Sequence, residues 1–206
     1  MYKKPVIVFE GIEGSGKTFH SKFVCKYLRK KKIPFINLRE PGGSNNSEKI
    51  RNLILNKKNN FDKFTDLLLY FASRSENMIK LRKEYKKKII IIDRFVDSTI
   101  AYQHFGQGVD IKTINFINNQ LLKNFKINLT FLNIVNIDNM ILRLKKRKKL
   151  NRYDQFDINF YKRVQNGFLK IAKKNSKAYK IIDSNLSIKS NKKIILDTVQ
   201  KLINVC

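Results

Sequence analysis

The sequence has little cysteine and no long apolar run. Its two cysteines, Cys25 and Cys206, lie far apart and form no C-x-x-C motif, which excludes a disulfide framework and a cysteine metal site. We expect both thiols to be reduced and without chemical role. No segment approaches the roughly 18 uninterrupted apolar residues of a membrane span. The N-terminal residues 1–5 lead into a strand-like run without a signal-peptide pattern, so we expect a cytoplasmic protein with no membrane partner.

Acidic residues are also scarce, because 44 Lys and Arg oppose only 16 Asp and Glu, giving a formal net charge of +28. One interpretation of this charge is a nucleic-acid or other anionic partner. The other is an AT-rich genome, since the codons for Lys, Asn, Ile, Phe and Tyr are all rich in A and T and all five residues are abundant. We favour the second interpretation and expect no nucleic-acid partner.

Apolar strand-like runs alternate with helical patterns along the 206 residues, which is typical of βα units and a parallel sheet. The runs are Val6–Phe9, Pro34–Leu38, Ile89–Ile92, Leu129–Ile134 and Tyr179–Ile182. The helical patterns are Lys17–Lys31, Ser47–Leu55, Asp62–Tyr85, Ile111–Phe125, Asp138–Lys146, Phe156–Lys174 and Ile188–Val205. We predict one α/β domain over residues 1–206, with a central five-stranded parallel sheet flanked by helices on both faces.

The strongest motif fits the phosphate-loop pattern G-x-x-x-x-G-K-[ST]. It reads Gly11, Ile12, Glu13, Gly14, Ser15, Gly16, Lys17, Thr18. The motif follows the first strand-like run and opens a helix, the context that phosphate loops need. Glycines allow inward-pointing N–H groups, the lysine reaches the β- and γ-phosphates, and the hydroxyl binds Mg²⁺. The motif predicts a nucleoside triphosphate but no particular reaction.

Polar sequences follow two further strand-like runs. Arg39–Gly43 comes after the second run, and Asp93 with Arg94 comes after the third. Because ligands sit beyond the carboxyl ends of parallel strands, we expect these segments to meet the phosphate loop. Asp93 is placed as a Mg²⁺-associated Asp, directly or through water, and Arg94 suits a second, phosphorylated substrate. The alternative is an ion pair between Asp93 and Arg94 that closes the strand end.

Two later groups of residues resemble a base pocket. Tyr70 and Arg74 lie one helical turn apart, so a stacking ring and a base-edge donor would share one helix face. The alternatives are a core tyrosine and a solvated arginine. Downstream, Ser98–Gln103 mixes hydroxyls, an aromatic ring and an amide, and spacing alone assigns none of them.

Taken together, these motifs resemble bacterial thymidylate kinase, in the P-loop nucleoside monophosphate kinase superfamily, over essentially the whole chain. The matching segments are E-G-x-E-G-x-G-K-T at Glu10–Thr18, R-E-P-G-G at Arg39–Gly43, Y-F-A-S-R at Tyr70–Arg74, D-R-F-x-x-S-T-x-A-Y-Q at Asp93–Gln103 and N-R-Y-D at Asn151–Asp154. The resemblance implies the P-loop kinase fold, a short basic lid at about residues 145–155, and transfer of the γ-phosphoryl group of ATP to dTMP. It also implies Mg²⁺ and a homodimer.

The resemblance also implies roles in the acceptor site. Glu13 would bond the 3′-hydroxyl of the deoxyribose, and Pro41 would shape the pocket. Arg94 and Arg51 would hold the acceptor phosphate. Tyr102 would crowd a ribose 2′-hydroxyl.

Further roles concern the base. Tyr70 would stack on thymine and Arg74 would bond its edge. Ser98, Thr99 and Gln103 would complete this part of the site.

Catalysis by this family uses an arginine from either the phosphate loop or the lid. Gly14 occupies the loop position, so the chain resembles the lid type, with Arg147 and Arg152 as candidates. We expect Arg152 to be catalytic, together with Lys17, Arg94 and Asp93, and Arg147 to bind ATP. The alternative is a solvated surface loop.

Two departures from the family pattern are Tyr70, where Phe is more common, and N-R-Y-D in the lid, where D-R-x-E is common. Two rival functions stay open. One is a P-loop phosphotransferase with another acceptor, and the other is a basic, DNA-binding P-loop ATPase.

Overall fold

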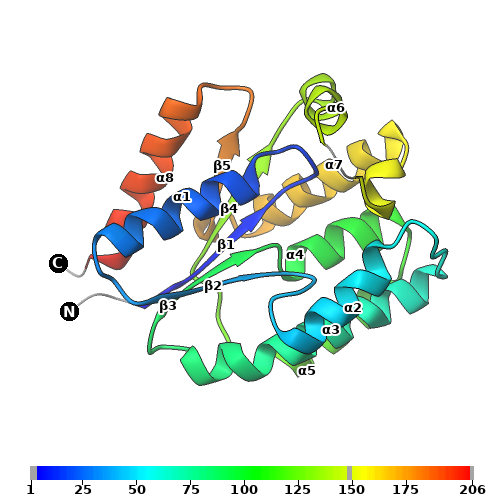
Figure 1. Cartoon of the computed structure of the whole chain (residues 1–206), viewed down its shortest axis with the longest axis horizontal. Coiled ribbons are helices and arrows are strands. Elements are labelled where there is room, and N and C mark those ends of the chain that lie inside the picture. Colours follow the sequence, from blue (N-terminus) through cyan, green and yellow to red (C-terminus); the bar gives the residue numbers. More distant parts are fainter. Residues whose placement is uncertain (1–3, 148–149, 205–206) are drawn as a thin grey trace.

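The structure is a computed structural model that describes residues 4–147 and 150–204 (Figure 1). Its sheet has five parallel strands in the order β2-β3-β1-β4-β5. The strands are β1 (Val6–Glu10), β2 (Phe35–Arg39), β3 (Ile89–Asp93), β4 (Leu129–Ile134) and β5 (Tyr179–Asp183). The predicted α/β class and five-stranded parallel sheet are therefore confirmed.

Four strands extend one residue further than predicted, to a polar residue at the carboxyl end. These residues are Glu10, Arg39, Asp93 and Asp183. Backbone pairing continues through them, since Asp93 lies opposite both Phe9 and Arg39 in the register. The polar ends of β1, β2 and β3 thus meet at one edge of the sheet.

Helices cover both faces of this sheet. They are α1 (Lys17–Lys30), α2 (Asn45–Leu55), α3 (Lys63–Glu84), α4 (Val96–Thr99), α5 (Ile111–Leu122), α6 (Ile137–Lys145), α7 (Ile158–Lys174) and α8 (Ile188–Ile203). Shorter turns are η1 (Ile100–Gly106), η2 (Arg152–Gln155) and η3 (Ser176–Ala178). The seven predicted helices are present, although the end predicted at Val205 lies outside the described residues.

The segment α4–η1 was not predicted as helical. Its first turn is only four residues long and rich in polar side chains, and η1 is a π-helix. A π-helix does not follow the 3.6-residue period on which sequence-based helix prediction depends.

Alternating side chains of the strands form separate cores on the two faces. Ile7 and Phe9 pack with α1 and α8, which lie together on one side of the sheet in Figure 1. Val6 and Val8 pack on the opposite face, with Met78 of α3. On that second side, Leu132 of β4 packs with α7. The strands are therefore held in a buried position that fixes where their ends lie.

Helix α7 and the π-helix η1 fit together through two reciprocal contacts. A Cβ atom at Gly106 would meet the Phe160 ring at 2.6 Å, and one at Gly167 would meet the Phe105 ring at 2.5 Å. Each ring thus occupies the space above a glycine of the other helix. This contact joins the segment after the predicted lid to the segment of the predicted base pocket.

Within the described residues Cys25 is buried and forms no disulfide, and Cys206 lies outside them. Among the described residues, no helix is both long and apolar enough to cross a membrane.

Candidate active site

The phosphate-loop motif lies between β1 and α1, as predicted. Gly16 is the residue before α1, has φ +84°, and is accompanied by no side-chain cap. The first N–H groups of the helix therefore have no side-chain acceptor and point toward the loop. Such a helix end favours an anion, because its N–H groups and dipole both carry positive charge.

Gly11 shows why the loop must begin with glycine. Its φ is +139°, and a Cβ atom there would lie 2.2 Å from the Asn133 carbonyl oxygen of β4. Contacts from α6 and from the residue after β5 fix the other side of the loop. The Ser184 hydroxyl donates to the Ser15 carbonyl, and Arg143 of α6 donates to the Gly14 carbonyl. The loop is thus held by its surroundings before any ligand binds.

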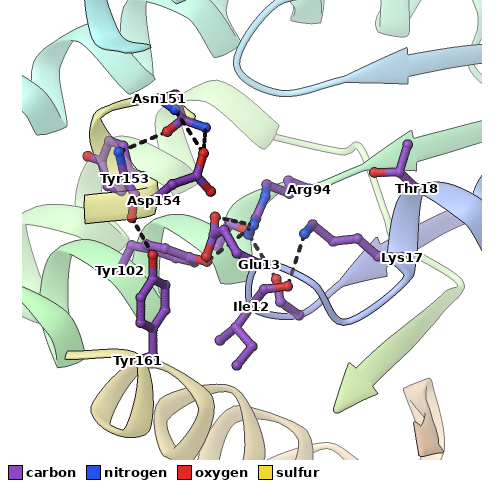
Figure 2. Close-up of polar contacts among 12 residues, drawn as sticks. Ile12, Glu13, Lys17, Thr18, Arg94, Tyr102, Asn151, Tyr153, Asp154 and Tyr161 are labelled. Atoms are coloured by element: carbon purple, nitrogen blue, oxygen red, sulfur yellow. Dashed lines mark hydrogen bonds and ion pairs between the residues drawn. The ribbon is translucent and has the colours of Figure 1, made fainter. Parts of the chain in front are cut away.

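Lys17 is only 7% exposed and points into this loop. Its amine donates to the Ile12 carbonyl at 3.2 Å and, in Figure 2, extends toward the Arg94 guanidinium. Burial, and then the charge of Arg94, lower the pKa of Lys17 to about 8. A triphosphate would supply the negative charge that this buried amine lacks.

Glu13 joins the loop to Arg94 and Tyr102 (Figure 2). The Arg94 guanidinium lies 2.7 Å from the Glu13 carboxylate, and Tyr102 donates to the other carboxylate oxygen. Burial alone would raise the pKa of Glu13, but Arg94 and Lys17 lower it below its usual value. Arg94 therefore pairs with Glu13, and not with Asp93 as the alternative interpretation had it.

Arg74 is 1% exposed and belongs to a buried polar network. Its guanidinium donates to Glu40 at 2.8 Å, to Asn118 at 2.9 Å and to Thr99 at 2.9 Å. The solvated alternative for Arg74 is thus wrong. The network fixes the orientation of the guanidinium where it reaches the cavity described next.

One cavity of about 290 Å³ brings most of the predicted residues together, close to the lower end of the volume range of ligand pockets. Of the predicted residues, it is lined by Glu13, Lys17, Thr18, Pro41, Arg51, Tyr70, Arg74, Asp93, Arg94, Ser98, Thr99, Tyr102, Gln103 and Arg147. Lys17, Arg94 and Arg74 therefore share one cleft. The sequence-based expectation that the strand ends converge is met.

The two lid arginines differ in position. Arg147 lines the cavity and forms an ion pair with Asp154 at 2.6 Å. Arg152 is not among the lining residues and pairs instead with Asp66 of α3. Its guanidinium also lies over the Phe61 ring, 5.6 Å from the ring centre. The expected catalytic arginine thus faces α3, and the other candidate lines the cavity. Residues 148–149 of the predicted lid lie outside the described residues.

Sequence reasoning missed Tyr153 and Arg143. Tyr153 is buried, accepts a hydrogen bond from Gln103 and donates to Asp66. The N-R-Y-D motif contained this tyrosine, but only its basic neighbour was assigned. Arg143 binds the Gly14 and Ser184 carbonyls, and nothing in its helical context distinguishes it from a surface arginine.

Thr18 and Asp93 lie side by side where Mg²⁺ was predicted. The Thr18 hydroxyl donates to Asp93 Oδ2 at 2.5 Å, while the buried Asp93 Oδ1 has no hydrogen-bond partner in the described part of the chain. The described residues contain no group of three or more His, Cys, Asp or Glu suited to a metal. This oxygen pair fits Mg²⁺, which commonly takes one or two protein oxygens and completes its shell with phosphates and water.

Comparisons with known proteins agree with this geometry. A family model described as thymidylate kinase matches residues 9–195. The chain is 35% identical to a thymidylate kinase of Sulfurihydrogenibium sp. (strain YO3AOP1), covering 95% of this chain and 96% of that protein. It is 39% identical to one of Ehrlichia ruminantium (strain Gardel), covering 95% and 98%. The crystal structure of thymidylate kinase from Ehrlichia chaffeensis aligns with a TM-score of 0.78 at 34% identity, covering 96% and 99%.

The lowered pKa of Lys17 predicts a pH limit on use of the triphosphate. The free protein must hold Lys17 protonated to attract phosphate, and this fraction falls as pH rises through about 8. We expect kcat/KM for ATP to fall about tenfold per pH unit above that point. In Lys17→Arg the guanidinium stays charged, so the fall should disappear even if the rate is lower. A flat wild-type profile between about pH 7.5 and 9.5 would contradict the assignment.

Proposed function

The chain belongs to the thymidylate kinase family and phosphorylates dTMP to dTDP with ATP, and we propose how the residues around its cavity do so. The observation that carries this proposal is the shared cleft of Lys17, Arg94 and Arg74. This cavity is lined by the lysine of the phosphate loop, by an arginine suited to a second phosphate group and by a buried donor for a base edge. That arrangement suits two nucleotides that meet phosphate to phosphate.

The donor side consists of the phosphate loop and the start of α1. Lys17 and the loop N–H groups would bind the β- and γ-phosphates of ATP. Thr18 and Asp93 would hold Mg²⁺, supported by the unpartnered Asp93 Oδ1. The metal, when bound, would neutralise charge on the phosphate oxygens.

The acceptor phosphate would lie between Arg94 and Arg51. Both guanidiniums line the cavity, and Arg51 already donates to the Pro41 carbonyl at 2.6 Å. Paired N–H donors suit a phosphate group. Glu13 is bound to Arg94 and Tyr102. Its carboxylate would therefore orient Arg94 and also accept a hydrogen bond from the sugar hydroxyl.

The base would lie deeper in the cavity. Arg74 and Gln103 would bond its edge, with Ser98 and Thr99 on the same segment, while Tyr70 would stack on it. The Tyr153 ring lies 5.9 Å from the Tyr70 ring at a steep angle and would close the pocket from the lid side. Arg74, Thr99 and Gln103 are buried, which penalises a base that leaves one of them unpaired.

Transfer would be direct and in line, without a covalent enzyme intermediate, because positioning and charge neutralisation supply most of the rate of phosphoryl transfer. We propose Arg147 as the lid arginine that neutralises charge on the transferring group, since it lines the cavity. Its charge also contributes, after burial and Arg94, to the lowering of the Lys17 pKa. Arg152 could take this role only after leaving Asp66.

We further propose that the chain is a single nucleoside monophosphate kinase domain that acts in the cytoplasm, where ATP is available. No nucleic-acid partner is proposed. A homodimer is supported by exposed apolar side chains on two neighbouring helices: Leu53 of α2 and Phe64, Leu68 and Ile79 of α3.

The acceptor panel tests the function. Purified protein with ATP and Mg²⁺ is offered dTMP, dUMP, dCMP, dGMP, AMP and thymidine, and ADP release is measured. We expect the highest kcat/KM with dTMP and no turnover of thymidine, because Arg94 and Arg51 require an acceptor phosphate. Preference for another acceptor would overturn the base assignment. ATP hydrolysis that depends on DNA and not on dTMP would favour the rival ATPase.

The two lid arginines can be separated by substitution. Arg147→Ala should lower kcat by about 10³-fold or more, as for other arginines that stabilise a transferring phosphoryl group. Arg152→Ala should have a smaller effect on kcat, because Arg152 faces Asp66. Lys145→Ala, in the same basic segment, is the matched control for loss of one lid charge. The reverse ranking would return the catalytic role to Arg152.

The dimer proposal is tested by light scattering at micromolar concentration. We expect the wild-type mass to be twice that of one chain. Replacing Leu68 and Ile79 by Lys would place charges on the exposed apolar side of α3 and should give a monomer. A monomeric wild type would contradict the proposal.

A further inference from the structure

Glu10 is a buried carboxylate that the reaction does not use directly. It is the last residue of β1, immediately before the phosphate loop, and its side chain is fully buried. It does not line the cavity. Its oxygens accept from the Phe95 N–H at 2.8 Å, the Ser98 N–H at 3.2 Å and the Ser98 hydroxyl at 2.5 Å.

These three bonds make Glu10 the cap of α4. The residue before this helix is Phe95, which cannot cap it, and no local side chain does so. A carboxylate from another strand therefore satisfies N–H groups that a helix start leaves free. The helix continues into η1 and carries Thr99, Tyr102 and Gln103 into the cavity.

The same carboxylate acts on Arg94. Arg94 has φ +67°, a strained conformation for a side chain of this size, and it donates to the Ser98 hydroxyl at 3.3 Å and the Gly11 carbonyl at 2.9 Å. The charge of Glu10 is among those that raise the pKa of Arg94. Glu10 is thus linked to Arg94 by the Ser98 hydroxyl, which donates to Glu10 and accepts from Arg94.

A second buried carboxyl lies beside this cap. Asp97 of α4 accepts from Tyr179 of β5 at 2.6 Å. Burial, and then the charge of Asp97, raise the pKa of Glu10 to about 7, while Ser98, Arg94 and the Phe95 N–H oppose this rise. The groups that face Glu10 are thus Asp97 on α4, Arg94 after β3 and Tyr179 on β5.

We propose that Glu10 is a positioning residue for the phosphoryl acceptor, whose ionised carboxylate fixes Ser98 and the first turn of α4 and thereby orients Arg94 toward the phosphate of dTMP. This rests on the proposed acceptor role of Arg94. Glu10, although it immediately precedes the phosphate loop, would then affect the binding of dTMP and not that of ATP.

Ionisation of Glu10 should lower the stability of the fold while it supports acceptor binding. The pKa of Glu10 is raised on folding from 4.5 to about 7, so the folded protein loses stability as pH rises through this window. Glu10→Gln keeps the shape of the side chain without the charge. The variant should therefore gain thermal stability relative to wild type as pH rises from 5 to 8, while it loses acceptor binding.

The experiment measures kcat/KM for dTMP and for ATP, together with Tm, from pH 5.5 to 9. In Glu10→Gln we expect kcat/KM for dTMP at pH 8 to fall on the order of tenfold, mostly through KM, with kcat/KM for ATP changed less than about threefold. In wild type, kcat/KM for dTMP should fall as pH drops below the Glu10 pKa of about 7. This acid limb of the pH profile should be absent in Glu10→Gln.

A second variant tests the neighbouring carboxyl. Asp97→Asn removes the charge that raises the pKa of Glu10, so the acid limb for dTMP should move to lower pH. The phosphate of dTMP titrates with a pKa of about 6, but this contribution is the same in every variant. Glu84→Gln, which removes an acid paired with Lys88 far from the cavity, is the control and should match wild type.

Three results would overturn the proposal. Equal losses for dTMP and ATP, together with a lower Tm, would mean that Glu10 only supports the fold. Tighter dTMP binding in Glu10→Gln would mean that the carboxylate acts merely as a repulsive charge. If the acid limb of kcat/KM for dTMP does not move in Asp97→Asn, the limb does not report the ionisation of Glu10. Failure of the acceptor panel in wild type is a different outcome, which would remove the proposed function itself.

Discussion

Arg94 is the residue on which the arrangement of the site depends. It leaves β3 with a left-handed backbone, while its N–H still donates to the Phe9 carbonyl of β1 at 2.9 Å. The last pair of the β1–β3 register thus sets where the guanidinium points. Its side chain then contacts the phosphate loop through Gly11 and Glu13 and the acceptor segment through Ser98 and Tyr102. A shift of either strand would separate the two proposed nucleotide sites.

The scarce acidic residues concentrate around these contacts. In a chain with a net charge of +28, the acidic residues in the described part that are buried as whole residues are Glu10, Glu13, Glu40, Asp66 and Asp97. Three of them form ion pairs with an arginine of the site or lid, and the other two are the carboxyls beside α4. Buried guanidiniums need such partners, because an uncompensated charge in this environment is costly.

Much of this could be predicted from the sequence because it is local. The phosphate loop, the five strands and the polar strand ends follow from residue types at fixed spacing, and parallel strands bring those ends to one edge. Other features could not be predicted, because they depend on contacts between distant segments. Glu10 contacts residues 85 and 88 positions away, and Asp66 meets Arg152 at a separation of 86. The π-helix η1 has no sequence period by which it could be recognised.

The different partners of the lid arginines also bear on which of them can move. Asp154 accepts from both the backbone N–H and the side-chain amide of Asn151, so it keeps two donors if Arg147 leaves it for a phosphate. Asp66 would keep only the Tyr153 hydroxyl on its carboxylate oxygens if Arg152 left. Both carboxylates are buried, and a buried carboxylate that loses its charged partner is strongly destabilising. The cost is larger for Asp66, because it keeps fewer donors. Release of Arg147 is therefore the easier movement, and it leaves Arg152 as the anchor that holds the lid on α3.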